Sequence, residues 1–210
     1  MDNALIPRRE REKNKHKEEI LEAALRLFSE KGFHNVSMQE IADKSEFGVG
    51  TIYNFFESKE SLFEELMKNG SDRITLEFSE ILDQPGSEKE RLAAFIRQLP
   101  KIQEQNGELI KLYISEFGVK RLKISKIRDE VNSHEAINIK LTRLIEQGIS
   151  NGLFRNVDPL ITAKSLGAII ERLIFETTGR FDKNTITEMF KKVEQLFLDG
   201  LLLPGGQTNE

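Results

Sequence analysis

Residues 37–56 contain the side chains whose types and spacing point most clearly to a chemical role. Ile52 and Phe56 are four residues apart, so a helix would direct both of them toward the protein interior. Small and polar groups would then occupy the outer face of that helix. A short helix of this kind, braced by another helix, has the geometry that enters a DNA major groove. The outward-facing residues of the predicted helix are Val49, Thr51, Tyr53 and Asn54.

The hydrogen-bonding groups of this segment suit two kinds of DNA contact. A glutamine amide can pair with adenine, and the methyl groups of valine and threonine can touch the thymine methyl. Hydroxyl and ammonium groups can instead donate to phosphate oxygens. We expect base-edge contacts from Gln39, Val49, Thr51 and Asn54, phosphate contacts from Ser37, Tyr53 and Lys59, and a place for Gly50 on the same surface.

Two short helices joined by a tight turn must hold these side chains in place. Ser37 and Glu40 have the spacing of a capping box, which predicts a first helix over about residues 37–44. Helical patterning stops near residues 45–48, and a second helix follows from residue 48 or 49 to about residue 55. The same pattern fits an ordinary helical hairpin in an all-α core, so periodicity alone leaves both interpretations open.

Residues on both sides of this segment extend the pattern. The set is Ala23, Ala24, Leu27, Phe28, Gly32, Ile41, Ala42, Gly50, Thr51, Tyr53, Phe56, Lys59 and Leu62. With these residues, the chain over about residues 20–62 resembles the N-terminal DNA-binding domain of the TetR family of bacterial transcriptional regulators. The resemblance implies an all-α fold: an N-terminal three-helix helix-turn-helix domain and a larger C-terminal helical domain for ligand binding and dimerisation. It also implies three partners, namely a double-stranded DNA operator, a small-molecule effector and a second copy of the chain.

Two positions depart from the family pattern. Ser45-Glu46 stands where the family usually has Ala-Gly in the turn, and a non-glycine residue at positive φ is uncommon. Either Glu46 is strained, or the turn is wound differently. Phe55 stands where the family usually has His or Tyr, and its ring cannot donate a hydrogen bond to phosphate. These departures support an alternative function: a helical small-molecule-binding or scaffold protein with a degenerate helix-turn-helix that does not read DNA.

Composition excludes several other classes of protein. The 210 residues carry a net charge of −4 and include no cysteine, so disulfides and thiolate metal sites are excluded. No apolar run approaches the roughly 20 residues of a membrane span, and no signal-peptide pattern opens the chain. We therefore expect a globular protein located in the cytoplasm.

The sequence signals for catalysis are weak. The glycines at Gly48 and Gly50 have neither a preceding strand nor the third glycine of a dinucleotide-binding loop. The pair His134-Glu135 would need a histidine at position 138 for a zinc helix, and Asn138 stands there instead. We expect no enzyme activity, no cofactor and no metal.

A basic stretch precedes the first predicted helix, which should span about Lys13 to Lys31. Such an arm can reach phosphates or a minor groove, although a solvated, frayed terminus has the same composition. Its cations are Arg8, Arg9, Arg11, Lys13, Lys15 and Lys17. The expected divisions of the chain are 1–17 for the basic arm, 13–62 for the helix-turn-helix domain, 63–203 for the ligand-binding and dimerisation domain, and 204–210 for a disordered tail.

Patterning in the second half of the chain predicts helices only. Pro100 should end or kink the helix that follows Ser87, and a long helix should span about residues 125–150. The last two helices have wide apolar faces interspersed with small residues. Such faces suit packing across a two-fold axis, but burial within one subunit would also explain them. The family resemblance implies a dimer in which these helices form a four-helix bundle.

Polar residues interrupt the apolar pattern of the second half. His134 and Asn138 lie one helical turn apart on an apolar stripe, where buried polar groups need partners. Internal hydrogen bonds or exposure at a helix flank would satisfy them, and so would a mostly apolar ligand cavity with a few orienting polar groups. The predicted ligand-binding residues are Tyr113, Glu116, His134, Asn138 and Arg172.

Together, the patterns and the resemblance predict a dimeric, DNA-binding transcriptional regulator. The predicted mode of action is that of a repressor which a small-molecule effector releases from a palindromic operator.

Overall fold

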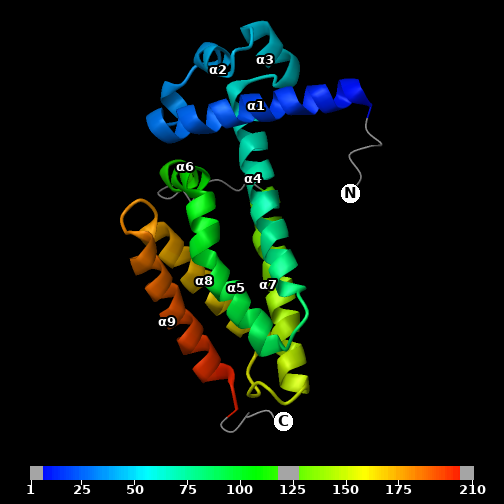
Figure 1. Ribbon diagram of the computed structural model, residues 1–210, viewed down its shortest axis with the longest axis vertical. Coiled ribbons are helices and arrows are strands. Elements are labelled where there is room, and N and C mark those ends of the chain that lie inside the picture. The colour runs from blue at the N-terminus through cyan, green and yellow to red at the C-terminus, as the bar shows by residue number, and fades with distance from the viewer. Residues whose placement is uncertain (1–6, 118–127, 204–210) are drawn as a thin grey trace. The chain divides into compact units, whose positions relative to one another are not determined.

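The computed structural model describes residues 7–117 and 128–203, and its described part is helical as predicted. Apart from one isolated bridge between Phe154 and Leu202, no strand pairing occurs among these residues. No helix in this part of the chain is both long and apolar enough to cross a bilayer. The elements are α1 (Arg8–Lys31), η1 (Phe33–Asn35), α2 (Met38–Ser45), α3 (Val49–Phe55), α4 (Lys59–Leu82), α5 (Glu88–Gln105), α6 (Gly107–Phe117), α7 (Arg128–Ser150), α8 (Pro159–Thr177) and α9 (Lys183–Leu201) (Figure 1).

The described residues form two compact units. The first unit comprises residues 7–69 together with residues 111–117, and the second comprises residues 70–110 and 128–203. Helices α4 and α6 each contribute residues to both units.

The first unit packs α1, α2, α3 and the start of α4 around a small apolar core. Ile20, Ile41, Ile52 and Leu62 are fully buried, so each helix supplies at least one side chain to the centre. The predicted inward pair of α3 is confirmed, because Phe56 is also buried. Burial of these side chains fixes which face of α3 is turned outward.

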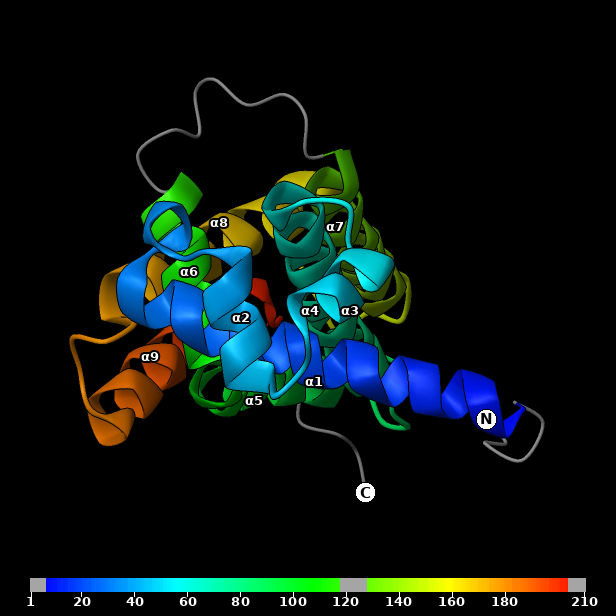
Figure 2. The same ribbon diagram turned by 90° about the horizontal axis from the view of Figure 1, so that it is seen from above.

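Helix α1 begins at Arg8, five residues before the predicted start, so residues 8–12 of the basic stretch are helical as well. Pro7 precedes the helix with a φ of −54°, which suits a helix start. Charge pairs then support the first turns: Arg8 bonds Glu12 at 2.8 Å, four residues along the helix. In two views, these first turns of α1 project beyond α3 (Figures 1 and 2).

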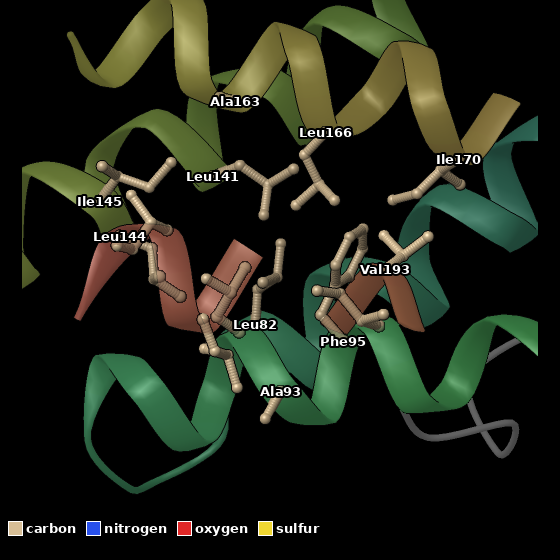
Figure 3. Close-up of a cluster of buried hydrophobic side chains, with 14 of the residues drawn as sticks. Leu82, Ala93, Phe95, Leu141, Leu144, Ile145, Ala163, Leu166, Ile170 and Val193 are labelled. Atoms are coloured by element: carbon tan, nitrogen blue, oxygen red, sulfur yellow. The ribbon is translucent and has the colours of Figure 1, made fainter. Parts of the chain in front are cut away.

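The core of the second unit is an interleaved set of leucine, isoleucine and phenylalanine side chains from α4, α5, α7, α8 and α9 (Figure 3). Packing there is close: a Cβ atom at Gly148 would lie 2.2 Å from the ring of Phe154, so the helix needs a glycine at that point. The labelled members of the cluster are Leu82, Ala93, Phe95, Leu141, Leu144, Ile145, Ala163, Leu166, Ile170 and Val193.

Helix α5 does not end at Pro100 but continues to Gln105. The proline lacks an N–H and so removes one hydrogen bond from the helix. The turn that follows buries Ile102 and Gln103, and this packing offsets the lost bond. Tertiary burial has therefore overridden a local helix-breaking signal.

Candidate nucleic-acid interface

Helix α2 begins with the capping box that the sequence predicts. The Ser37 hydroxyl accepts a hydrogen bond from the Glu40 amide at 3.2 Å, and the Ser37 amide donates to the Glu40 carboxylate at 2.9 Å. Lys31, at the end of α1, also reaches this carboxylate at 2.7 Å. The Lys31 ammonium, followed by the amide and hydroxyl of Ser37, lowers the pKa of Glu40 from its usual 4.5 to about 2. The start of α2 is thus tied to the end of α1.

The turn between α2 and α3 resolves the question raised by Glu46. Glu46 adopts the left-handed conformation, with φ 60° and ψ 28°, and it is the one non-glycine residue with positive φ among the described residues. Its neighbour Phe47 donates an amide hydrogen bond to the Ala42 carbonyl at 3.0 Å, which closes the helix end. The turn is wound in the left-handed way that glycine favours, and Glu46 occupies it at some conformational cost.

Helix α3 presents polar side chains that have no hydrogen-bonding duty within the described part of the chain. Tyr53 is 53% exposed and Asn54 is exposed beside it, while Thr51 and Val49 are half-buried at the start of the helix. Gly50 is exposed, and a Cβ atom there would meet nothing within 4 Å. The face of α3 is therefore open at Gly50, Tyr53 and Asn54 and partly open at Val49 and Thr51.

The polar groups contributed by α2 are already used within the protein. Gln39 donates its amide to the Asp43 carboxylate at 2.8 Å, and the Ser37 hydroxyl donates to Glu40 at 3.0 Å. Both side chains remain exposed. Either could contact DNA only by exchanging or sharing its present partner.

Lys59 has an internal role that its sequence position does not reveal. Its ammonium donates to the carbonyl oxygens of Phe33 at 2.9 Å and Val36 at 2.8 Å, with the carbonyl of His34 at 3.5 Å. The same nitrogen lies 4.6 Å from the centre of the Phe33 ring. An ammonium has three donors, and these oxygens can occupy all of them. In this structure Lys59 joins the start of α4 to η1 and to the segment that leads into α2.

A hollow of about 560 Å³ lies between the start of α1 and the end of α3. Arg9, Lys13 and Lys17 recur every four residues and so share one face of α1. Lys17 pairs with Glu65, whereas Arg9 and Lys13 form no ion pair with any described residue. The lining consists of Pro7, Arg9, Glu10, Lys13, Asn14, Lys17, Asn54 and Phe55.

This hollow is lined both by a predicted DNA-contact residue and by a residue that departs from the family pattern. Asn54 is a predicted base-contact residue, and Phe55 is one of the two departures from the family pattern. Phe55 gives the hollow an apolar wall, while α1 supplies its cations. The four-residue spacing of Arg9, Lys13 and Lys17 was the available signal, but it has this meaning only if α1 starts before Arg9.

The predicted ligand-binding residues are divided between the two units. Tyr113 and Glu116 lie on the part of α6 that belongs to the first unit. The Glu116 carboxylate accepts a long hydrogen bond from the Phe33 amide at 3.4 Å and lies 3.9 Å from His34 Nε2. Glu116 therefore contacts η1 instead of lining a cavity of the C-terminal domain.

The other three candidates belong to the second unit. Arg172 is exposed and pairs with Glu176 one turn along α8, so the structure places it at the surface and not within the expected cavity. Asn138 is half-buried on α7, and a Cβ atom at Gly167 of α8 would lie 3.3 Å from its Oδ1. The side chain of His134 lies outside the described residues.

Comparison with known proteins agrees with this architecture. The family "Bacterial regulatory proteins, tetR family" matches residues 20–66, which include α2 and α3. The HTH-type transcriptional regulator YfiR of Bacillus subtilis is 27% identical over 85% of this chain and 90% of its own length. The HTH-type transcriptional repressor KstR2 of Mycolicibacterium smegmatis is 26% identical over 66% of this chain and 67% of its own.

A solved structure extends the fold comparison to nearly the whole chain. The transcriptional regulator FadR of Bacillus subtilis, in complex with stearoyl-CoA, superposes with a TM-score of 0.71 at 18% identity, covering 87% of this chain and 97% of that one. At that identity the likeness establishes the fold. The family match identifies residues 20–66 as a DNA-binding domain of the TetR family of bacterial transcriptional regulators, and the regulator relatives extend the similarity along most of the chain.

Proposed function

We propose that the chain is a dimeric repressor that binds a palindromic DNA operator through α3 and the start of α1, and that a small molecule releases it. The observation that carries the DNA-binding part is the open face of α3. Its polar side chains have unused hydrogen-bonding capacity, and a cationic hollow adjoins its end. The alternative of a degenerate helix-turn-helix loses its main support, because the turn at Glu46 keeps the left-handed winding.

Base recognition belongs to α3 in this proposal. Asn54 can form two hydrogen bonds with an adenine edge, while the methyl groups of Thr51 and Val49 can contact thymine. Gly50 leaves the start of the helix free of a side chain, so DNA can approach closely there. Tyr53, with its exposed hydroxyl, is placed to donate to a phosphate.

Phosphate binding belongs chiefly to α1. Arg9 and Lys13 are cations with no ion-pair partner among the described residues, and they line the same hollow as Asn54. A sugar-phosphate strand beside the major groove would meet them when α3 reads the bases. Neutralising phosphates with such cations releases counterions, so these contacts should make affinity depend on salt.

The partner for dimerisation is a second copy of the chain, which would pack against α8 and α9. Leu196 on α9 is 64% exposed and Ile161 on α8 is 62% exposed, although both are large apolar side chains. A two-fold axis through such faces would bury them in both copies at once. It would also present two copies of α3 to successive major grooves, about 34–36 Å apart.

The relatives support the proposal that the protein represses transcription and that an effector releases it from DNA. KstR2 is named a transcriptional repressor, and the FadR structure contains stearoyl-CoA. In the present chain, Asn138 remains a candidate ligand contact, half-buried between α7 and α8. An effector would act by binding more tightly to a conformation in which the recognition helices are wrongly spaced.

Selection of genomic fragments by the purified protein tests the proposal. Recovery of one palindromic sequence, with an affinity much above that for random DNA, is the expected result. The variant Asn54→Ala should fold normally and lose or change that preference. Uniform weak binding to every fragment would contradict the proposal and favour a helical scaffold whose helix-turn-helix does not read DNA.

A further inference from the structure

The second unit contains a buried amide with an unusual hydrogen-bonding state. Gln103, near the end of α5, is 4% exposed. Its Nε2 donates to the hydroxyls of Thr177 and Thr178, both at 2.9 Å. Its Oε1 is buried and has no hydrogen-bond partner among the residues that the structure describes. Buried polar atoms are normally satisfied, so this oxygen calls for a donor that the described residues do not supply.

The neighbouring hydroxyls fix the orientation of this amide. Thr177 donates its hydroxyl hydrogen to the Leu173 carbonyl at 2.7 Å, and Thr178 donates to the Ile174 carbonyl at 2.6 Å. Each hydroxyl has one hydrogen, so toward Gln103 both can act only as acceptors. The NH₂ group must therefore face the two threonines. Flipping the amide would set oxygen against oxygen, so Oε1 is forced to point elsewhere.

The apolar side chains toward this end of the second unit are more exposed than those of its core. Along α8, Leu166 and Ile170 are buried, whereas Ile174, one turn before the threonines, is only half-buried. Along α7, Leu141 is buried, whereas Ile137 is half-buried. The short connection from α7 to α8 makes these helices antiparallel, so Ile137 lies on the part of α7 that runs toward the end of α8 that contacts Gln103.

The backbone supplies a second hydrogen-bond acceptor on the same face of α5. Pro100 precedes Gln103 by three residues, is buried, and cannot donate to the carbonyl of Ile96. The Ile96 carbonyl therefore lacks its usual donor four residues along the helix, on the same face as the unpartnered Gln103 Oε1. A ligand suited to this place has an apolar body and a hydrogen-bond donor.

We propose that this end of the second unit binds a neutral, mostly apolar small molecule whose hydroxyl or amine hydrogen bonds to Gln103 Oε1. The inference rests on the proposed function, because such a ligand would be the effector. It adds a chemical class: a carboxylate or an ether oxygen would face Oε1 as acceptor against acceptor and would be disfavoured. A buried water on Oε1 is the competing explanation, and a water would give no discrimination among ligands.

Two probes of equal size separate these possibilities. Decan-1-ol carries a hydroxyl donor, whereas 1-methoxynonane has the same number of heavy atoms and only an acceptor. Their dissociation constants for the full-length protein can be measured by displacement of an apolar fluorescent dye. Wild type should bind the alcohol about 3- to 10-fold more tightly than the ether, which is what one buried hydrogen bond contributes.

The variant Gln103→Leu keeps the side-chain size and removes the acceptor, so it should bind the two probes equally. Gln98→Leu, at an exposed position of the same helix, should keep the wild-type ratio. Equal binding of both probes to wild type, or binding of neither, would overturn the inference without reference to any variant. An unchanged ratio in Gln103→Leu would overturn it as well.

Failure of this inference is distinguishable from failure of the proposed function. Probe binding requires no DNA, and operator selection requires no probe. A protein that selects a palindrome but does not prefer the alcohol has lost only the Gln103 site. A protein that prefers the alcohol but selects no DNA keeps the site and loses the proposed function.

Discussion

The polar side chains around the helix-turn-helix fall into two groups with opposite states. At α2 and the start of α4, the polar groups of Ser37, Gln39 and Lys59 are bonded within the protein. On α3 and the start of α1, those of Asn54 and Arg9 have no partner among the described residues. Sequence position made both groups look equally available to DNA. The structure shows that one group stabilises the fold, while the other is open to a ligand.

The difference matters because a hydrogen bond already made inside the protein must be given up before the same donor can serve DNA. The net gain from such an exchange is small. A donor that faces solvent gives up only water, and a cation beside phosphate also releases counterions. We therefore expect energetic roles to follow bonding state more closely than distance from the recognition helix.

The largest expected effect is on stability, from Lys59→Met. This variant removes the ammonium from the carbonyls of Phe33 and Val36 and should lower the free energy of unfolding by about 2–3 kcal/mol, the typical scale for bonds to a charged group. Urea unfolding measures the change. Lys44→Met, at an exposed position in the last turn of α2, is the matched control and should be nearly neutral. Unchanged stability in Lys59→Met would mean that its internal bonds contribute little.

The next effect is on affinity, from the double variant Arg9→Ala with Lys13→Ala. Loss of two unpaired cations from the hollow should weaken operator binding roughly 10- to 100-fold at moderate salt. Stability should not change, because both side chains are exposed. The double variant Arg11→Ala with Lys15→Ala removes the same charge from residues that do not line the hollow. Equal losses in the two double variants would show that net charge matters and the hollow does not.

A smaller effect on base preference should separate α3 from α2. Asn54→Ala should change discrimination at one base pair by about 1–3 kcal/mol. Gln39→Ala should change it less, since the Gln39 amide is bonded to Asp43. Competition binding with single-base operator variants gives both numbers. The opposite ranking would mean that Gln39 exchanges its partner on binding and that α2 reads bases.

The smallest effect concerns the pH dependence of the link between α1 and α2. Lys31 and Ser37 lower the pKa of Glu40 to about 2, so the ionised carboxylate stabilises the folded state. That contribution is fully present above the unfolded-state value near 4.5 and is lost as pH falls toward 2. Glu40→Gln should therefore be less stable than wild type from pH 5 to 7. The difference should shrink between pH 4.5 and 2, and a difference that stays constant with pH would contradict this role.

Local signals predicted most of the secondary structure. The Ser37–Glu40 capping box set the start of α2, and Asp158 followed by Pro159 set the start of α8. Such signals act through neighbours in the chain and so can be found from sequence. The start of α1 lies five residues before the predicted one, because charge pairs between turns support a helix in a stretch with few apolar residues. Pro100 does not end α5, because the residues after it are buried against other helices, which the local sequence does not reveal.

Site residues were harder to predict, for a physical reason. Exposure of Tyr53 and Asn54 follows from helical periodicity once Ile52 is inside. The carbonyls that surround Lys59 come from residues more than twenty positions earlier, and no local pattern brings them together. Similarly, the contact of Glu116 with the Phe33 amide joins residues 83 positions apart. Partners of this kind are properties of the fold.

The salt dependence of operator affinity tests the division between the two groups most directly. Wild type, Lys59→Met and the Arg9→Ala, Lys13→Ala double variant would be compared over the same range of salt concentration. The double variant should reduce the slope of log K against log salt concentration by about 1.8, or about 0.9 for each phosphate that is no longer neutralised. Lys59→Met, studied at a temperature where it is folded, should keep the wild-type slope. A slope reduced in Lys59→Met and unchanged in the double variant would contradict the assignment of phosphate binding to α1.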